Sequence, residues 1–193
     1  MWNAGEHGFA LGIGSNDRGV ESSSSRTTVV KQPGNKEWVT VLEGISAAGQ
    51  RMKSLVIFKG KNLSSGWIPD TSTLDWAYCS SPTVWMSNDI VLKWLEQVFI
   101  PSTPTEGYRL LLRDGHKSHF THKLMWKFHT NKIVIFYLIP HSSHILQPLD
   151  LTCFSSVKAK YRAKIAELSR FDGASDIKKQ TFINYILKLA TKV

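Results

Sequence analysis

The sequence predicts an α/β protein with a mixed, five-stranded sheet, in one domain that spans residues 1–193. Three observations lead to this prediction. There are alternating β-branched segments of strand length, apolar residues at helical spacing, and a strand–helix–strand series in the second half. Two strands joined by a short turn form an antiparallel hairpin, whereas a strand–helix–strand series implies a parallel pair. Both pairings together make the sheet mixed.

The strands are predicted from alternation and β-branched content. A short first strand lies within residues 2–12. Segment 37–45 (EWVTVLEGI) alternates, and segment 52–59 (MKSLVIFK) follows it after a turn, so the two are expected to pair as a hairpin. Segments 108–114 and 133–139 flank a helical segment and are expected to lie parallel in the sheet.

A helix is predicted over residues 87–100, where Ser87 or Asn88 can cap its start and Pro101 and Pro104 are expected to end it. Its expected apolar face consists of Val91, Trp94, Leu95, Val98 and Phe99.

Three further helices are predicted over residues 121–130, 154–169 and 175–190. Their expected apolar positions are, in turn, Leu124, Met125 and Phe128; Phe154, Val157, Tyr161, Ile165 and Leu168; and Phe182, Ile186 and Leu189. Residues 61–83 are predicted to be irregular. The aromatic rings of Trp67, Trp76 and Tyr78 within them suit core packing better than stacking on unpaired bases.

Composition narrows the class of partner. The formal net charge of +9 and pI of about 9.6 suit a polyanion such as nucleic acid, although a merely basic soluble protein fits the charge equally well. Two cysteines, Cys79 and Cys153, are too few for a disulfide framework and fit a reducing compartment. The apolar runs are far shorter than a membrane span, so no membrane partner is expected.

The two most informative motifs lie at the ends of two predicted strands. DGHKSH begins at Asp114, and PHSSHILQPLD, over residues 140–150, ends at Asp150. These two motifs at this separation resemble the DDE superfamily endonuclease domain of pogo/Tigger-type transposases, especially fungal ones. The segments QPGNKEWVT (32–40), LVIFKG (55–60) and WLEQVFIP (94–101) extend the resemblance over essentially the whole chain. The element order is also that of a ribonuclease H-like fold.

The resemblance implies a metal-dependent nuclease. In this family three acids hold two Mg²⁺ (or Mn²⁺) ions, which stabilise the attacking and leaving oxygens when DNA is cut and joined. Asp114 and Asp150 match the second and third acids, so the resemblance gives both catalytic and metal-binding roles. When residues 2–12 are aligned on the family pattern, the first acid falls at Gly5, which has no side-chain ligand.

Glu6 is a poor substitute for that acid, because successive strand residues point to opposite faces of a sheet. Arg113 also departs from the family, which has an apolar residue there, and it is expected to reach solvent at the strand end because a buried unpaired charge is costly. The resemblance further implies that intact relatives carry a helix-turn-helix region upstream of residue 1. A truncated, decayed transposon copy explains these departures together, and the last helix, within 170–193, is expected to be incomplete.

Histidines and basic residues complete the expected site. Those expected to line it beside Glu6 are His116, His119, His141 and His144, which could orient the acids, contact phosphate, or serve only as structural hydrogen-bonding groups. A zinc site is disfavoured, since no further ligand completes a tetrahedral set. The basic residues expected to face DNA, or simply solvent, are Lys158, Lys160, Arg162 and Lys164.

The predicted function is that of a transposase-derived DDE endonuclease domain that binds DNA and whose cleavage is impaired by Gly5. The alternatives are a residually active nuclease, a non-catalytic DNA-binding or interaction module, and a remnant that scarcely folds. The resemblance also implies a homodimer and a nuclear location.

Overall fold

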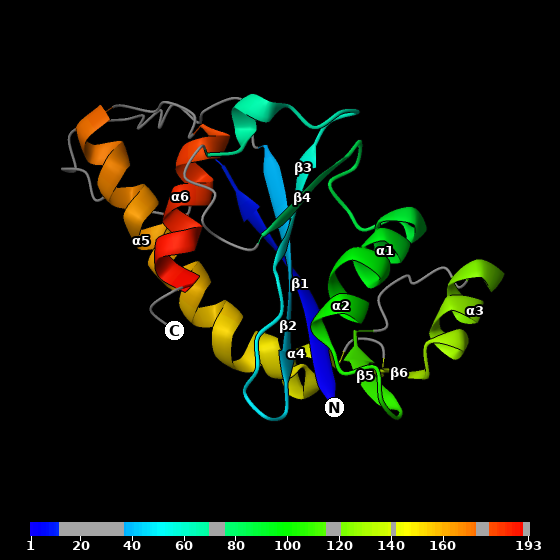
Figure 1. Ribbon diagram of the computed structural model, residues 1–193. Coiled ribbons are helices and arrows are strands. Elements are labelled where there is room, and N and C mark those ends of the chain that lie inside the picture. Colours follow the sequence, from blue (N-terminus) through cyan, green and yellow to red (C-terminus); the bar gives the residue numbers. More distant parts are fainter. Residues whose placement is uncertain (12–36, 70–75, 115–120, 140–141, 173–177, 191–193) are drawn as a thin grey trace.

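The computed structural model describes six stretches of the chain, which are residues 1–11, 37–69, 76–114, 121–139, 142–172 and 178–190 (Figure 1). Within them lies a six-stranded sheet in the order β4-β3-β2-β1-β5-β6. The strands are β1 (Trp2–Ala10), β2 (Trp38–Ser46), β3 (Leu55–Lys59), β4 (Ala77–Ser81), β5 (Arg109–Arg113) and β6 (Ile133–Tyr137).

The sheet is mixed, as the sequence predicts. β1 runs antiparallel to β2, and β2 runs antiparallel to β3, which confirms the hairpin. β1 pairs with β5 in parallel, and β5 pairs with β6 in parallel, so the strand–helix–strand series forms the expected crossover. β1 is therefore central and carries neighbours of both directions.

The predicted count of five strands is wrong, because β4 adds a sixth at the edge beyond β3. It lies within residues 61–83, which were expected to be irregular. Its sequence, AYCSS, lacks the alternation and β-branched content that mark a strand, and four of its five residues are only half-buried. Trp67 packs at a tilt against Phe58 and Tyr78 stacks near it, with ring centroids 5.5 and 6.5 Å away, so their predicted packing role is confirmed.

Helices cover both faces of the sheet (Figure 1). The helical elements are η1 (Ser65–Trp67), α1 (Asn88–Trp94), the π-helical η2 (Leu95–Phe99), α2 (Ile100–Ser102), α3 (His122–Thr130), α4 (Ser143–Leu146), the π-helical η3 (Asp150–Phe154), α5 (Ser155–Asp172) and α6 (Lys179–Ala190). Ser87 caps α1 by accepting a hydrogen bond from the Ile90 amide at 3.4 Å. The helical run of α1, η2 and α2 is continuous and ends at Ser102, between Pro101 and Pro104, as expected.

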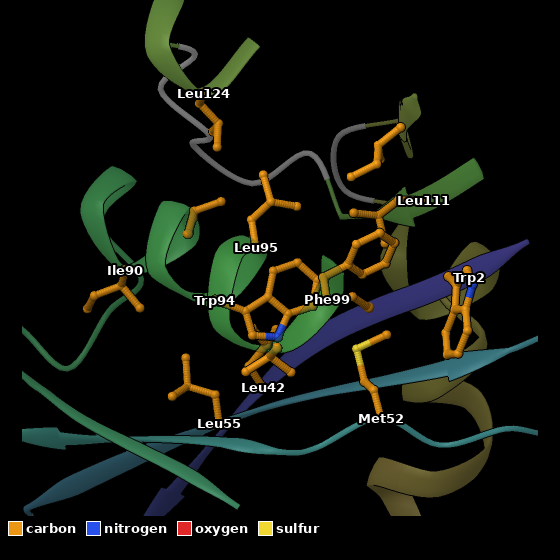
Figure 2. Packing of buried hydrophobic residues seen from close by; sticks show 14 of the residues in the cluster. Trp2, Leu42, Met52, Leu55, Ile90, Trp94, Leu95, Phe99, Leu111 and Leu124 are labelled. Carbon is orange, nitrogen blue, oxygen red and sulfur yellow. The ribbon is translucent and has the colours of Figure 1, made fainter. Parts of the chain in front are cut away.

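The first core lies between the sheet and the α1–α3 side. Figure 2 shows Trp94 and Phe99 packed above Leu42 and Leu55, and the predicted apolar face of residues 87–100 is buried there in full. Leu124 and Phe128 of α3 join this core, but Met125 does not and is 45% exposed, contrary to prediction.

The second core lies between the other face of the sheet and α5 and α6. Phe9 of β1 packs edge-on against Tyr161 of α5, with centroids 5.1 Å apart, and against Phe182 of α6. Lys179 closes this side by pairing with Glu37 at 2.7 Å. β1 thus contributes its alternate residues to two different cores, which fixes the face on which each of its side chains lies.

Candidate functional site

Gly5 and Asp114 lie side by side at the centre of the sheet. The parallel register pairs Asn3 with Leu112 and Ala4 with Arg113, and the next step brings residue 5 level with Asp114, which directly follows β5. Level residues on parallel neighbours point to the same face. The structure therefore places position 5 where a carboxylate would face Asp114, and that position is a buried glycine.

The Gln147 side chain fills the space beside Gly5. An ideal Cβ on Gly5 would lie 2.5 Å from Gln147 Nε2 and 3.0 Å from the Phe154 ring. Hydrogen bonds hold the Gln147 amide in place: Nε2 donates to the Ala4 carbonyl at 3.1 Å, and Oε1 accepts from Asn3 Nδ2 at 2.9 Å. An amide thus occupies the volume that a first acid would require.

Asn3 extends the same network to the neighbouring elements. Its Nδ2 also donates to the Leu112 carbonyl of β5 at 3.4 Å, and its Oδ1 accepts from the Leu149 amide at 3.4 Å. This ties β1 and β5 to the segment that carries Asp150. The sequence contained both Asn3 and Gln147 within its family-like motifs, but their contact joins residues 144 apart in the chain, a relation that no local pattern reveals.

Asp150 opens the π-helical turn η3, and π turns occur frequently at functional sites. Partial burial raises the pKa of its carboxyl, the ammonium group of Lys158 opposes that rise, and the charge of Asp114 adds to it. The two acids are therefore close enough to repel each other. Asp114 Oδ1 is buried, and none of the residues that the structure describes donates a hydrogen bond to it. The structure brings these two predicted acids together.

Glu6 lies on the opposite face of β1 from Gly5. Gly5 and His7 are buried against the η3 side, whereas Glu6 is exposed and its carboxylate acts on Arg113. Its placement agrees with strand alternation, and Glu6 does not join the two aspartates.

Arg113 is buried, so the expectation that it reaches solvent is wrong. It is 8% exposed, its guanidinium lies 5.9 Å from the Trp94 ring centroid, and it donates to Met86 Sδ at 3.0 Å. Burial lowers its pKa, and the negative charges of Glu6 and Asp114 oppose that shift. Aromatic and thioether cover from α1 and its preceding turn replaces the solvent that was expected.

His7 is a buried histidine that the sequence analysis did not single out. It is 3% exposed, it stacks on Phe154 at a centroid distance of 3.8 Å, and neither ring nitrogen has a hydrogen-bond partner. Burial, with a smaller contribution from Lys158, lowers its pKa to about 3. Its place in the Gly5, His7, Phe9 alternation could have marked it as inward-facing.

The other expected site residues divide into two groups. His116, His119 and His141 lie outside the described residues, and the side chain of His144, in α4, is not described either. On α5, Lys158 is half-buried near Asp150, Lys160 and Arg162 are exposed, and Lys164 pairs with Glu167 at 2.8 Å. Across the described stretches, no three His, Cys, Asp or Glu side chains are grouped so as to hold a metal ion.

Comparison with known families shows to which family the chain belongs. The family of DDE superfamily endonucleases matches residues 35–190. The chain belongs to this family.

One relative by sequence and one solved structure are similar to the DDE domain. It is 38% identical over 172 residues to a protein of Cochliobolus lunatus named MFS-type transporter clz9, and the match covers 87% of the domain but only 19% of that protein. None of the helices described for the DDE domain has the length and hydrophobicity of a membrane span. Its fold is similar to a chain of the Mos1 strand transfer complex, with a TM-score of 0.50 and 12% identity over 99% of this chain and 52% of that one. The predicted ribonuclease H-like class is confirmed.

Proposed function

We propose that this DDE domain binds DNA and that its metal-dependent cleavage is lost or severely impaired. One observation carries the proposal: position 5, level with Asp114, is a glycine whose side-chain space is filled by the Gln147 amide. The acid that would complete a set with Asp114 and Asp150 is therefore missing, and the exposed Glu6 points to the other face.

The remaining acids suit one hard cation better than two. Carboxylate oxygens are the ligands that Mg²⁺ and Mn²⁺ prefer, and the unpartnered Asp114 Oδ1 is such an oxygen. Asp114 and Asp150 would hold one ion with water in its other positions. A bound ion would supply Lewis-acid activation of a phosphate and lower the pKa of a bound water. A second ion lacks the carboxylate that would share it, so no two-ion step follows from these residues.

DNA binding is supported by charge and by the fold. Exposed Lys160 and Arg162 lie on α5, the helix that continues from the turn of Asp150, so a phosphate backbone near the acids could reach both. Likeness to a chain of a strand transfer complex adds support at the level of fold alone. Binding as a homodimer in the nucleus belongs to the same proposal.

The proposal is tested by separating binding from cleavage. The purified chain is expected to bind linear duplex DNA with an affinity that falls as salt rises, and to nick supercoiled plasmid in Mg²⁺ or Mn²⁺ no faster than its Asp114→Asn variant. Nicking that Asp114→Asn abolishes would show that the two remaining acids suffice. Absence of any salt-dependent DNA binding would remove the other half of the proposal.

A residually active single-ion nuclease is the second candidate. The observation in its favour is the buried Asp114 Oδ1, since a buried carboxylate oxygen without a donor suits a cation. Because partial burial, with a smaller contribution from the charge of Asp114, raises the pKa of Asp150, such an activity would increase with pH as that carboxyl loses its proton.

A further inference from the structure

The outer face of α3 carries the indole ring of Trp126, which packs in neither hydrophobic core. Trp126 is 68% exposed and the adjacent Met125 is 45% exposed, whereas Leu124 and Phe128 on the inner side are buried. Figure 1 shows α3 at the margin of the molecule, so this face is open to solvent. Within the part of the chain that the structure describes, the Trp126 ring contacts His129 and belongs to neither core.

Trp126 lies in an open hollow whose composition points to an anion-bearing, planar ligand. The hollow is lined by His122, Lys123, Met125, Trp126 and His129. No acid is among these lining residues. The ring centroids of Trp126 and His129 lie 6.1 Å apart at an interplanar angle of 38°, so the two rings form one continuous aromatic surface in the hollow.

Glu96 is an acid next to α3, and its negative charge is already paired with a lysine of that helix. Glu96 pairs with Lys127 at 2.8 Å, and Lys127 and Lys123 lower its pKa. Because Lys123 lines the hollow beside the exposed indole, the surface combines a cation with an aromatic platform. Single-stranded nucleic acids are bound by this combination, in which bases stack on aromatic rings and basic side chains follow the backbone.

We propose that the α3 hollow binds an unpaired nucleobase of a DNA strand, with Trp126 as the stacking platform and Lys123 at the adjoining phosphate. The inference rests on the proposed DNA-binding function and assigns part of it to a second surface, separate from Asp114 and Asp150.

This surface lies within reach of a strand held at the acids. α3 starts at His122, eight residues after Asp114, and an extended chain spans at most about 3.6 Å per residue, so the two lie no more than ~29 Å apart. That is the length of about eight nucleotides at 3.4 Å each. Trp126 lies about 6 Å further along α3, so a strand of about ten nucleotides that leaves the duplex beside Asp114 and passes the end of β5 can reach it.

The test compares two exposed tryptophans in the full chain. Trp85, in the turn before α1, is 66% exposed and does not line the hollow, so Trp85→Ala is the matched control for Trp126→Ala. Fluorescence anisotropy would measure binding of a labelled oligothymidine and of a blunt duplex of equal length. Trp126→Ala should weaken oligothymidine binding about 5- to 150-fold, Trp126→Phe should retain most of it, and Trp85→Ala should leave it unchanged.

Each other outcome overturns the inference. Equal losses in Trp126→Ala and Trp85→Ala, or no loss in either, would show that the hollow is not a base-stacking site, while duplex binding by the wild type would leave the proposed function standing. If the wild type binds neither probe, both proposals fall. If Trp126→Ala alters only the oligomeric state measured by light scattering, the surface binds protein and not DNA.

Discussion

Gln147 and Gly5 form a matched pair: the amide nitrogen of Gln147 lies 2.5 Å from where a side chain on residue 5 would begin. The amide is held by the Ala4 carbonyl and the Asn3 side chain. A side chain at position 5 and the present placement of the Gln147 amide therefore exclude each other, because an acid at position 5 requires the amide to move.

This pairing predicts a coupled cost for side chains at position 5. Gly5→Ala should lower the free energy of unfolding by about 1–3 kcal/mol, since the new Cβ overpacks against Gln147 and Phe154. Gln147→Ala should destabilise by itself through the lost hydrogen bonds, and the double variant should be less destabilised than the sum. Urea denaturation of the four proteins measures the coupling, and strict additivity would contradict the contact.

The buried His7 should make the stability of the folded protein sensitive to acid. Its pKa falls from 6.5 to about 3 on folding, so below pH 6.5 the unfolded chain binds the proton that the folded chain excludes. Stability should therefore decrease as pH falls from 6.5 towards 3, by up to about 1.4 kcal/mol per pH unit from this residue. His7→Phe keeps the stacking on Phe154 and should flatten that decline when unfolding is measured by urea at several pH values. An unchanged slope would show that folding does not lower the pKa of His7.

Arg113 predicts a stabilising substitution. Its charge is buried over Trp94 and beside Met86, where desolvation is costly. Arg113→Leu should therefore be neutral or raise stability by about 1–4 kcal/mol, whereas Arg113→Lys should lower it because an ammonium is more strongly hydrated. Thermal melts of the two variants rank them, and a large loss in Arg113→Leu would show that the charge has a partner worth more than its desolvation.

The basic residues of α5 predict the salt dependence of DNA binding. Replacing the exposed Lys160 and Arg162 with glutamine should reduce the slope of log affinity against log salt by about 1.8, at ~0.9 per phosphate contact. Lys164→Gln is the control, since Lys164 already pairs with Glu167, and its change should stay below about 0.5. Equal changes in both would mean that α5 attracts DNA only through overall charge.

Sequence patterns predict a strand well where apolar and polar residues alternate along it. The expected strand 37–45 agrees with β2 to within one residue at each end, because its period of two leaves a single way to face the core. The same rule predicted that Glu6 would lie away from the face of Asp114. β4 was not predicted, because its AYCSS sequence has no such period. It is a strand of the sheet because it pairs with β3.

Sequence motifs single out the two candidate acids, but they do not predict what surrounds these acids. Motifs single out Asp114 and Asp150 and align Gly5 with the first acid, and the parallel register of β1 and β5 brings residue 5 level with Asp114. The burial of Arg113 and the insertion of Gln147 depend on contacts between elements far apart in the chain, and sequence spacing carries no information on them.

The most direct test of the central claim is to restore the first acid. Supercoiled plasmid nicking in Mn²⁺ and Mg²⁺ would be measured for the wild type, Gly5→Asp, and Gly5→Asp with Gln147→Ser, which makes room for the carboxylate. At least one restored variant should nick about tenfold or more faster than the wild type, since one catalytic group is worth ~10² or more in rate. Adding Asp150→Asn should abolish that gain. Equal nicking by all of these folded proteins would contradict the claim that Gly5 disables the site.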